Sequence, residues 1–202
     1  MASTNASTLK DAFERNQYDL VTASRKSRSW FEGEVMKMTR QQWTPQKILK
    51  GNPQEITQKI LPGFLYMYMY DPKTKADLPY YDKFPLVFPF RKTADGFIGL
   101  NMHYLPYQFR IQLLDRLMIF SNNKRIDEST RLKLSWQLLD GVSRYQMAKP
   151  CVKQYLMSHV KSQFRRVPSD NWVTAMMLPV ERFVGTSKQA VFSDSLKIAR
   201  RG

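Results

Sequence analysis

Residues 64–70 read FLYMYMY, and this stretch decides the fold of the central part of the chain. Its side chains alternate in two sets, Tyr66, Tyr68 and Tyr70 in one and Leu65, Met67 and Met69 in the other. Because side chains of a β-strand point alternately to the two faces of a sheet, this period of two indicates a strand. We therefore predict a strand with a tyrosine face and an aliphatic face.

Two further strands are expected downstream of this stretch. Residues 86–90 read LVFPF, residues 97–104 read FIGLNMHY, and Asp95-Gly96 between them is typical of a hairpin turn. Pro85 and Pro89 predict an edge position or an irregular strand, because proline cannot donate a ladder hydrogen bond. Together these strands predict a small antiparallel SH3-like barrel or curled sheet over about residues 63–105.

The spacing of apolar residues becomes helical after this sheet. A stripe over residues 107–118 predicts one helix, and Ser129 or Thr130 is the expected N-cap of a second, which ends near Tyr145. A third helix is predicted after Pro150, with a buried side formed by Val152, Tyr155, Leu156, His159 and Val160.

The remaining C-terminal segments are shorter. Residues 164–167 predict a returning strand, and Ser169 or Asp170 is expected to begin a short helix that Pro179 ends or kinks. Residues 195–202 are expected to form a basic tail. With the strands before them, these segments predict an α+β domain over residues 62–202.

The N-terminal part differs in composition from the rest. Residues 1–24 are rich in Ser, Thr, Asn and Ala and predict an arm, and a first helix is expected from Ser29. Residues 42–62 contain several prolines and a glycine, which is typical of a linker, with a short helix expected over about 54–60. We therefore divide the chain into residues 1–61, an arm with a helix and a linker, and residues 62–202.

The charge of the chain is the first indication of function. It contains 32 basic and 17 acidic residues, a formal net charge of +15, and residues 145–202 hold ten basic against three acidic side chains. Such a field favours association with polyanions. Two groups of basic residues are predicted to bind nucleic acid. The first is an arc on the third predicted helix, formed by Lys153, Lys161 and Arg165, with Arg166 directly after it. The second lies in the tail and consists of Lys197, Arg200 and Arg201. For any one of them, an ordinary solvated helix face is the alternative.

Tyrosines of the first strand offer a second candidate surface. An exposed row formed by Tyr66, Tyr68 and Tyr70 could stack on bases, as aromatic strands do in single-strand binders. Such a row more often packs under a loop or against a neighbouring subunit. Base stacking and a partner surface therefore both remain open for these three residues.

The residue types argue against an enzyme. Two histidines and one cysteine without paired spacing do not indicate a metal site, and no phosphate-cradling glycine loop is present. We expect no cofactor, no metal and no small-molecule substrate. A metal-dependent nuclease built on Asp71, Asp77 and Asp82 with the nearby lysines is the catalytic alternative.

Neither secretion nor a membrane position is expected from the sequence. The N-terminal residues lack the apolar core of a signal peptide, and no window approaches the ~18 apolar residues of a membrane span. A single cysteine, Cys151, cannot form an internal disulfide. We expect a protein that is made in a cytoplasm or packaged from one.

Several stretches of the chain resemble a known family. They are residues 70–75 (YDPKTK), 78–87 (LPYYDKFPLV), 96–106 (GFIGLNMHYLP), 149–153 (KPCVK) and 178–183 (LPVERF), and the resemblance covers about residues 62–185. The chain is similar here to late virion proteins of T-even-like tailed phages, of the DNA-end protector family. Within these stretches Tyr80, Tyr81, Phe84, Asn101, His103 and Tyr104 fit a role in holding the sheet and its loop together.

The resemblance implies a protein of the virion, made in the host cytoplasm, with no catalytic residues. Its partners would be double-stranded DNA ends, which it would cap against exonuclease, and other virion proteins such as portal, neck or baseplate subunits. It would also help to complete the head. A structural subunit of the tail, baseplate hub or neck that binds acidic neighbouring proteins is the alternative.

Overall fold

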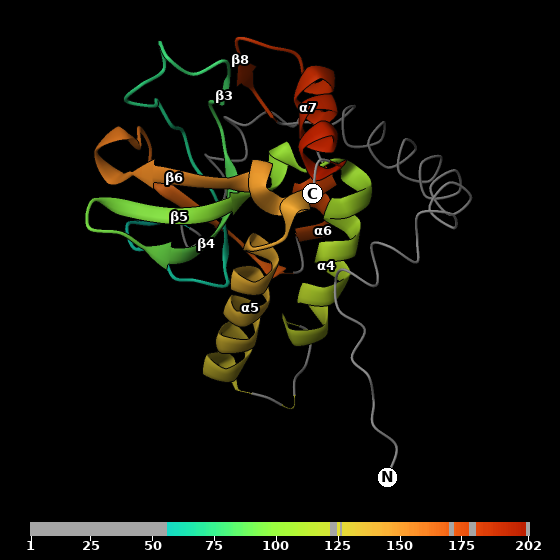
Figure 1. The fold of residues 1–202 in the computed structure, drawn as a ribbon. Helices are drawn as coiled ribbons and strands as arrows, with labels where there is room; N and C mark the ends of the chain where they lie inside the picture. Colours follow the sequence, from blue (N-terminus) through green and yellow to red (C-terminus); the bar gives the residue numbers. More distant parts are fainter. Residues whose placement is uncertain (1–55, 122–124, 126, 170–171, 178–180, 201–202) are drawn as a thin grey trace.

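The computed structural model describes residues 56–121, 125, 127–169, 172–177 and 181–200 (Figure 1). The expected N-terminal arm and the helix from Ser29 lie outside these residues. The described part contains a larger and a smaller antiparallel sheet together with several helices, so the expected α+β class is confirmed.

The larger sheet has six strands in the order β1-β7-β2-β4-β5-β6, and each neighbouring pair is antiparallel. A smaller sheet pairs β3 with β8. The bounds are β1 (Ile56–Thr57), β2 (Leu65–Met67), β3 (Tyr81–Asp82), β4 (Leu86–Lys92), β5 (Gly96–Asn101), β6 (Val152–Leu156), β7 (Phe164–Val167) and β8 (Phe183–Val184).

The FLYMYMY stretch alternates as expected and makes the sheet curl. Its first half forms β2 between β7 and β4, whereas its second half pairs with the segment that follows β6. Lys161 N donates to Met69 O at 2.8 Å, and Asp71 N donates to His159 O at 3.1 Å. The segment after β6 therefore returns across the far end of β2, which gives the expected curled sheet rather than a closed barrel.

Strand β4 contains Pro89 and directly follows Pro85, the two prolines from which an edge position or an irregular strand was expected. It lies between β2 and β5, so the expected edge position is wrong, whereas the expected irregularity is present as a register shift between Pro89 and Arg91. A bulge places the residue that lacks an N–H where the ladder is already interrupted.

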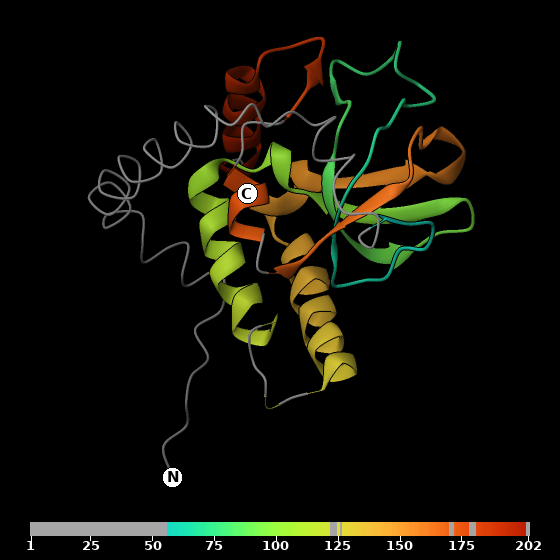
Figure 2. The ribbon, with the colours of Figure 1, turned by 180° about the vertical axis from the view of Figure 1, so that it is seen from behind.

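The helices gather on one side of the larger sheet (Figures 1 and 2). Their bounds are α4 (Tyr107–Ser121), α5 (Glu128–Ser143), α6 (Trp172–Met177) and α7 (Lys188–Arg200), with short 3-10 turns η2 (Met102–Tyr104), η3 (Gln146–Cys151) and η4 (Met157–His159). The N-cap of α5 is Asp127, whose carboxylate accepts from Thr130 N at 2.9 Å, so this helix begins slightly earlier than expected. None of the helices described is long and apolar enough to cross a membrane.

Three expected elements differ in the structure. The prediction of a third helix after Pro150 is wrong, because residues 152–156 form β6 and pair along their length with β5. The expected tail is the last part of α7, and the expected helix over 54–60 contains β1. In each case a partner far away in sequence decides the conformation of a short segment whose own pattern fits more than one period.

The two faces of the curled sheet bury two separate clusters. Leu65 and Met67 pack with β4, β5 and the helices in the larger core. The opposite face buries an aromatic cluster formed by Tyr66, Tyr68, Tyr70, Val87, Phe97, Tyr155 and Phe164. At its centre Tyr68 meets Phe164 and Tyr155 edge to face, with ring centroids 4.9 and 5.5 Å apart.

Close packing between β4 and β5 leads to a first prediction, at Gly99. A Cβ there would lie 2.3 Å from Val87 Cγ1 and 2.9 Å from Phe88 O. We expect Gly99→Ala to lower the free energy of unfolding by about 1–3 kcal/mol, as overpacked core substitutions do. Gly141→Ala is the control, since a Cβ there meets nothing within 4 Å and should stabilise α5 by about 0.5–1 kcal/mol. Equal urea midpoints for the Gly99 variant and the wild type would contradict this packing.

Candidate nucleic-acid interface

The seven basic residues predicted to bind nucleic acid lie in separate places. Lys153 is in β6, and three strands of the larger sheet lie between it and β7, which holds Arg165 and Arg166. Lys161 follows η4, and Lys197 is in α7. Arg200 ends α7, but its side chain is outside the described residues, as is the whole of Arg201. The expected arc on one helix does not exist, since that segment is a strand.

Lys153 is held against the protein body. Its Nζ lies 4.2 Å from the centroid of the Tyr104 ring, and burial lowers the pKa of its ammonium group. An ammonium on a ring face is partly desolvated, so it is less suited than an exposed lysine to a mobile contact with a phosphate.

Neighbouring arginines of β7 point to opposite faces. Arg165 is only 3% exposed and pairs in register with Met67 of β2. Arg166 is exposed, pairs in register with Tyr66, and its Cζ lies 5.1 Å from the centroid of the Phe64 ring. Arg166 is therefore the member of this pair whose side chain can meet a ligand. Lys197 is also exposed, but its Nζ lies 3.4 Å from the Asp194 carboxylate.

The tyrosine row lies inside the domain. Tyr66, Tyr68 and Tyr70 are 1%, 0% and 7% exposed, because the curled sheet and the segment after β6 enclose them. Burial raises the pKa of all three hydroxyls. Their rings pack against one another and against Phe97, Tyr155 and Phe164, so they do not offer faces to bases in this structure.

Asp82, one of the three carboxylates of the alternative nuclease site, is buried in a polar network. Its Oδ2 lies 2.7 Å from His103 Nδ1 and accepts from Asn101 Nδ2 at 3.2 Å, while Oδ1 accepts from Phe84 N at 3.1 Å. Asp71 instead pairs with Lys75 at 3.0 Å on the surface. Within the described residues no group of three or more His, Cys, Asp or Glu side chains could hold a metal ion.

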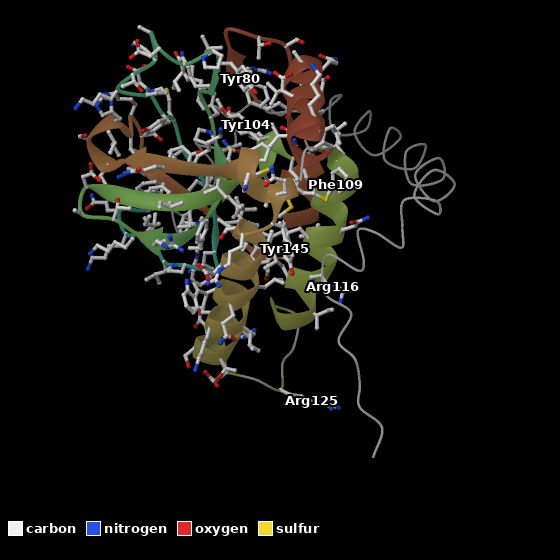
Figure 3. The ribbon with its side chains drawn as sticks, in the orientation of Figure 1. Tyr80, Tyr104, Phe109, Arg116, Arg125 and Tyr145 are labelled. Carbon is white, nitrogen blue, oxygen red and sulfur yellow. The ribbon has the colours of Figure 1, made fainter. Side chains whose placement is uncertain are left out.

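Residues of the same network fix the smaller sheet to the larger one. Asn101 also donates to Tyr155 OH at 3.1 Å. Figure 3 shows Tyr80 above Tyr104, and their rings stack with centroids 6.1 Å apart, while Phe183 of β8 meets Tyr104 edge to face. These contacts hold β3 and β8 in place beside the end of β2.

This anchoring brings three exposed cations onto neighbouring backbone segments. Lys161 N donates to Met69 O at 2.8 Å, Tyr70 N donates to Lys83 O at 3.0 Å, and Lys83 N donates to Arg182 O at 2.9 Å. Four chain segments thus lie side by side at one end of the larger sheet. We call Lys83, Lys161 and Arg182 the basic strip.

The strip is spaced for a charged polymer. Neighbouring strands lie ~4.8 Å apart, so the backbones of Lys161 and Arg182, three such steps apart, are separated by at most about 14 Å. A nucleic-acid strand rises 3.4 Å per phosphate along the axis, so this length covers roughly four phosphates. The strip therefore suits contact with several phosphates of one backbone.

Acidic groups near the strip are already engaged. Asp82 is buried with His103, and the Glu181 carboxylate lies 2.9 Å from Lys188 Nζ. The Lys75 hydrogen bond lowers the pKa of Asp71, with smaller contributions from charges that include Lys161. No carboxylate within the described residues forms a salt bridge with Lys83, Lys161 or Arg182. Their charges thus stay available to a polyanion.

Two arginines lie at another part of the surface. Figure 3 places Arg116 and Arg125 along α4 and just after it, at the end of the molecule opposite to β3 and β8.

Comparison with known families identifies the chain. The family described as phage T4 terminal DNA protecting protein matches residues 6–199. The chain belongs to this family. No curated protein and no solved structure gave a significant match.

Membership of the DNA-protecting family confirms the resemblance and extends it beyond residues 62–185 in both directions. Two stretches that carried the resemblance, 78–87 and 178–183, contain β3 and the first residue of β8, and they meet in the smaller sheet. Lys83 and Arg182 come from these two stretches. Neither was named as a candidate binding residue from the sequence, although their position in the matching stretches was a signal that could have suggested them.

Proposed function

We propose that this chain is a virion protein that binds the ends of double-stranded DNA and protects them by steric occupancy. The observation that carries the proposal is the basic strip on a chain of this family, since exposed cations with no acidic partner bind phosphates. Protection by occupancy needs no catalytic group, in keeping with a protein that is not an enzyme. A role in head completion, through portal or neck subunits, is a further part that rests on family membership alone.

The strip by itself explains affinity for DNA, but preference for an end needs a second feature. Phosphate contacts carry no sequence information, and the same contacts are available along the whole duplex. End occupancy therefore requires a surface that only a terminus can satisfy.

A competition experiment tests the proposal. Full-length protein is titrated against labelled linear duplex at two salt concentrations, with the same duplex as a covalently closed circle as competitor, and exonuclease digestion is followed in parallel. We expect linear DNA to compete far better than circular DNA, affinity to fall steeply with salt, and digestion to slow. Equal competition together with unchanged digestion would contradict the proposal. It would favour the alternative, a tail, baseplate or neck subunit whose charge meets acidic neighbouring proteins.

A further inference from the structure

A cleft of about 250 Å³ opens between α5 and the start of β2. Figures 1 and 2 both show the segment that leads into β2 turning beside α5. One wall comes from α5, the other from the residues around Phe64 and from the end of β7 with the turn after it. The residues that line it include Phe64, Arg131, Leu132, Arg166, Ser169 and Trp172.

The chemistry of the cleft suits a nucleotide. The guanidinium of Arg166 lies over the Phe64 ring, with Cζ 5.1 Å from the ring centroid, and we call this pair the Phe64–Arg166 platform. Bases stack on such aromatic and arginine surfaces. Leu132 and the buried Trp172 supply an apolar floor, and Ser169 supplies a hydroxyl. Arg131 and the exposed Arg166 line the cleft, and Arg166 forms no salt bridge with a carboxylate of the described residues, so its guanidinium can meet a phosphate.

The size of the cleft limits what it can hold. Its volume is slightly below the ~300–1,000 Å³ of pockets that enclose drug-sized ligands, which leaves room for about one nucleotide. A base inside a continuous duplex is stacked on both sides and cannot enter. A terminal nucleotide needs to lose stacking on only one side, so the cleft can select a terminus.

The cleft and the basic strip lie at the two ends of the FLYMYMY stretch. Phe64 begins it and Tyr70, whose N–H bonds to Lys83, ends it. Six residues of strand span at most roughly 20 Å. Duplex rises 3.4 Å per base pair, so about six base pairs cover this distance. A nucleotide in the cleft therefore leaves the adjoining phosphates within reach of the strip.

We infer that this cleft holds one unpaired nucleotide at the DNA terminus, its base on the Phe64–Arg166 platform and its phosphate beside Arg131 and Arg166. The inference rests on the proposed function and adds the surface that separates an end from the interior of a duplex. Occupancy of the cleft also removes the terminal phosphodiester from the reach of an exonuclease.

The experiment compares linear duplexes that end in one unpaired nucleotide with the same duplexes carrying an abasic residue there, on the 3′ strand and on the 5′ strand in turn. Base stacking on protein aromatics should make the base-bearing end bind about 5- to 150-fold more tightly on at least one strand. Phe64→Leu keeps apolar volume but removes the ring, and Arg166→Gln changes an exposed side chain that should not affect folding. Phe64→Leu should lose most of this preference and retain binding to the abasic duplex. Arg166→Gln should also lose most of this preference, and it should bind the abasic duplex more weakly than the wild type does because one phosphate contact is missing.

Lys92→Gln, an exposed lysine at the end of β4, is the matched control and should keep the full preference. If the wild type binds base-bearing and abasic termini equally, or if both cleft variants keep the preference for the base-bearing terminus, the cleft is not the terminal site. The proposed function would still stand in that case, provided that linear DNA outcompetes circular DNA. Equal competition by circular DNA would contradict the proposed function itself, whereas loss of the terminal preference alone would contradict only the role of the cleft.

Discussion

Replacing Arg110 with alanine is expected to lower the free energy of unfolding by about 3–5 kcal/mol, the loss typical of a buried charged group whose partners are left behind. Arg110 is completely buried, and its guanidinium donates to Leu105 O at 2.6 Å, Met176 O at 2.7 Å and His103 O at 3.0 Å. Truncation leaves three buried carbonyls without a donor, and each unsatisfied group costs about 1–3 kcal/mol.

The environment of Arg110 explains why the charge is tolerated. Burial lowers the pKa of the guanidinium, while the nearby Glu181 carboxylate opposes this shift. The Tyr107 ring covers one face, with its centroid 4.4 Å from Cζ. Arginine stays protonated in proteins, so the side chain acts as a permanent link between η2, α4 and α6.

Arg144→Ala provides the matched control. Arg144 is exposed and pairs with Asp140 one helical turn earlier, an interaction that contributes about 0–1 kcal/mol. Urea unfolding at neutral pH, followed by circular dichroism, measures both variants. A loss for Arg110→Ala no larger than that for Arg144→Ala would show that the three carbonyls find other partners.

The local elements of the fold could be predicted from the sequence where one period is clear. Alternation in FLYMYMY, the hairpin at Asp95-Gly96 and the 3.6-residue stripe over 107–118 each specify one conformation, and the strand over 164–167 has the expected bounds. Residues 152–160 fit a helix as well as a strand. Pairing with β5 decides between them, and that partner lies more than fifty residues away.

The candidate site was harder to predict, because the sequence shows how many basic residues a segment contains but not where the fold places their side chains. The excess of basic residues in the last third was visible, yet strand alternation buries Arg165 and exposes Arg166. Lys83 and Arg182 lie about a hundred residues apart and meet only through the pairing of β3 with β8. The loop over residues 71–82 contains three acidic residues among lysines. In the structure Asp71 forms a surface ion pair, whereas Asp82 belongs to a buried polar network.

Removing the basic strip should have the largest effect on DNA binding. In the triple variant Lys83→Gln, Lys161→Gln and Arg182→Gln, three phosphate contacts are lost, and the slope of log affinity against log salt should become shallower by about 3. If the two proteins bind equally near 1 M salt, affinity at about 0.15 M salt should fall on the order of 100-fold. The three side chains are exposed, so stability should change by less than about 1 kcal/mol.

A second triple variant separates a localised interface from diffuse attraction. Lys92→Gln, Lys133→Gln and Lys149→Gln change the net charge equally, and these lysines are exposed on β4, α5 and η3 rather than on the strip. Long-range attraction depends on net charge, so both triple variants should slow association to a similar extent. Only direct phosphate contacts release condensed counterions, so the strip variant alone should show the large change in salt slope. Equal changes in slope would mean that DNA contacts the whole basic surface and that the strip is not the interface.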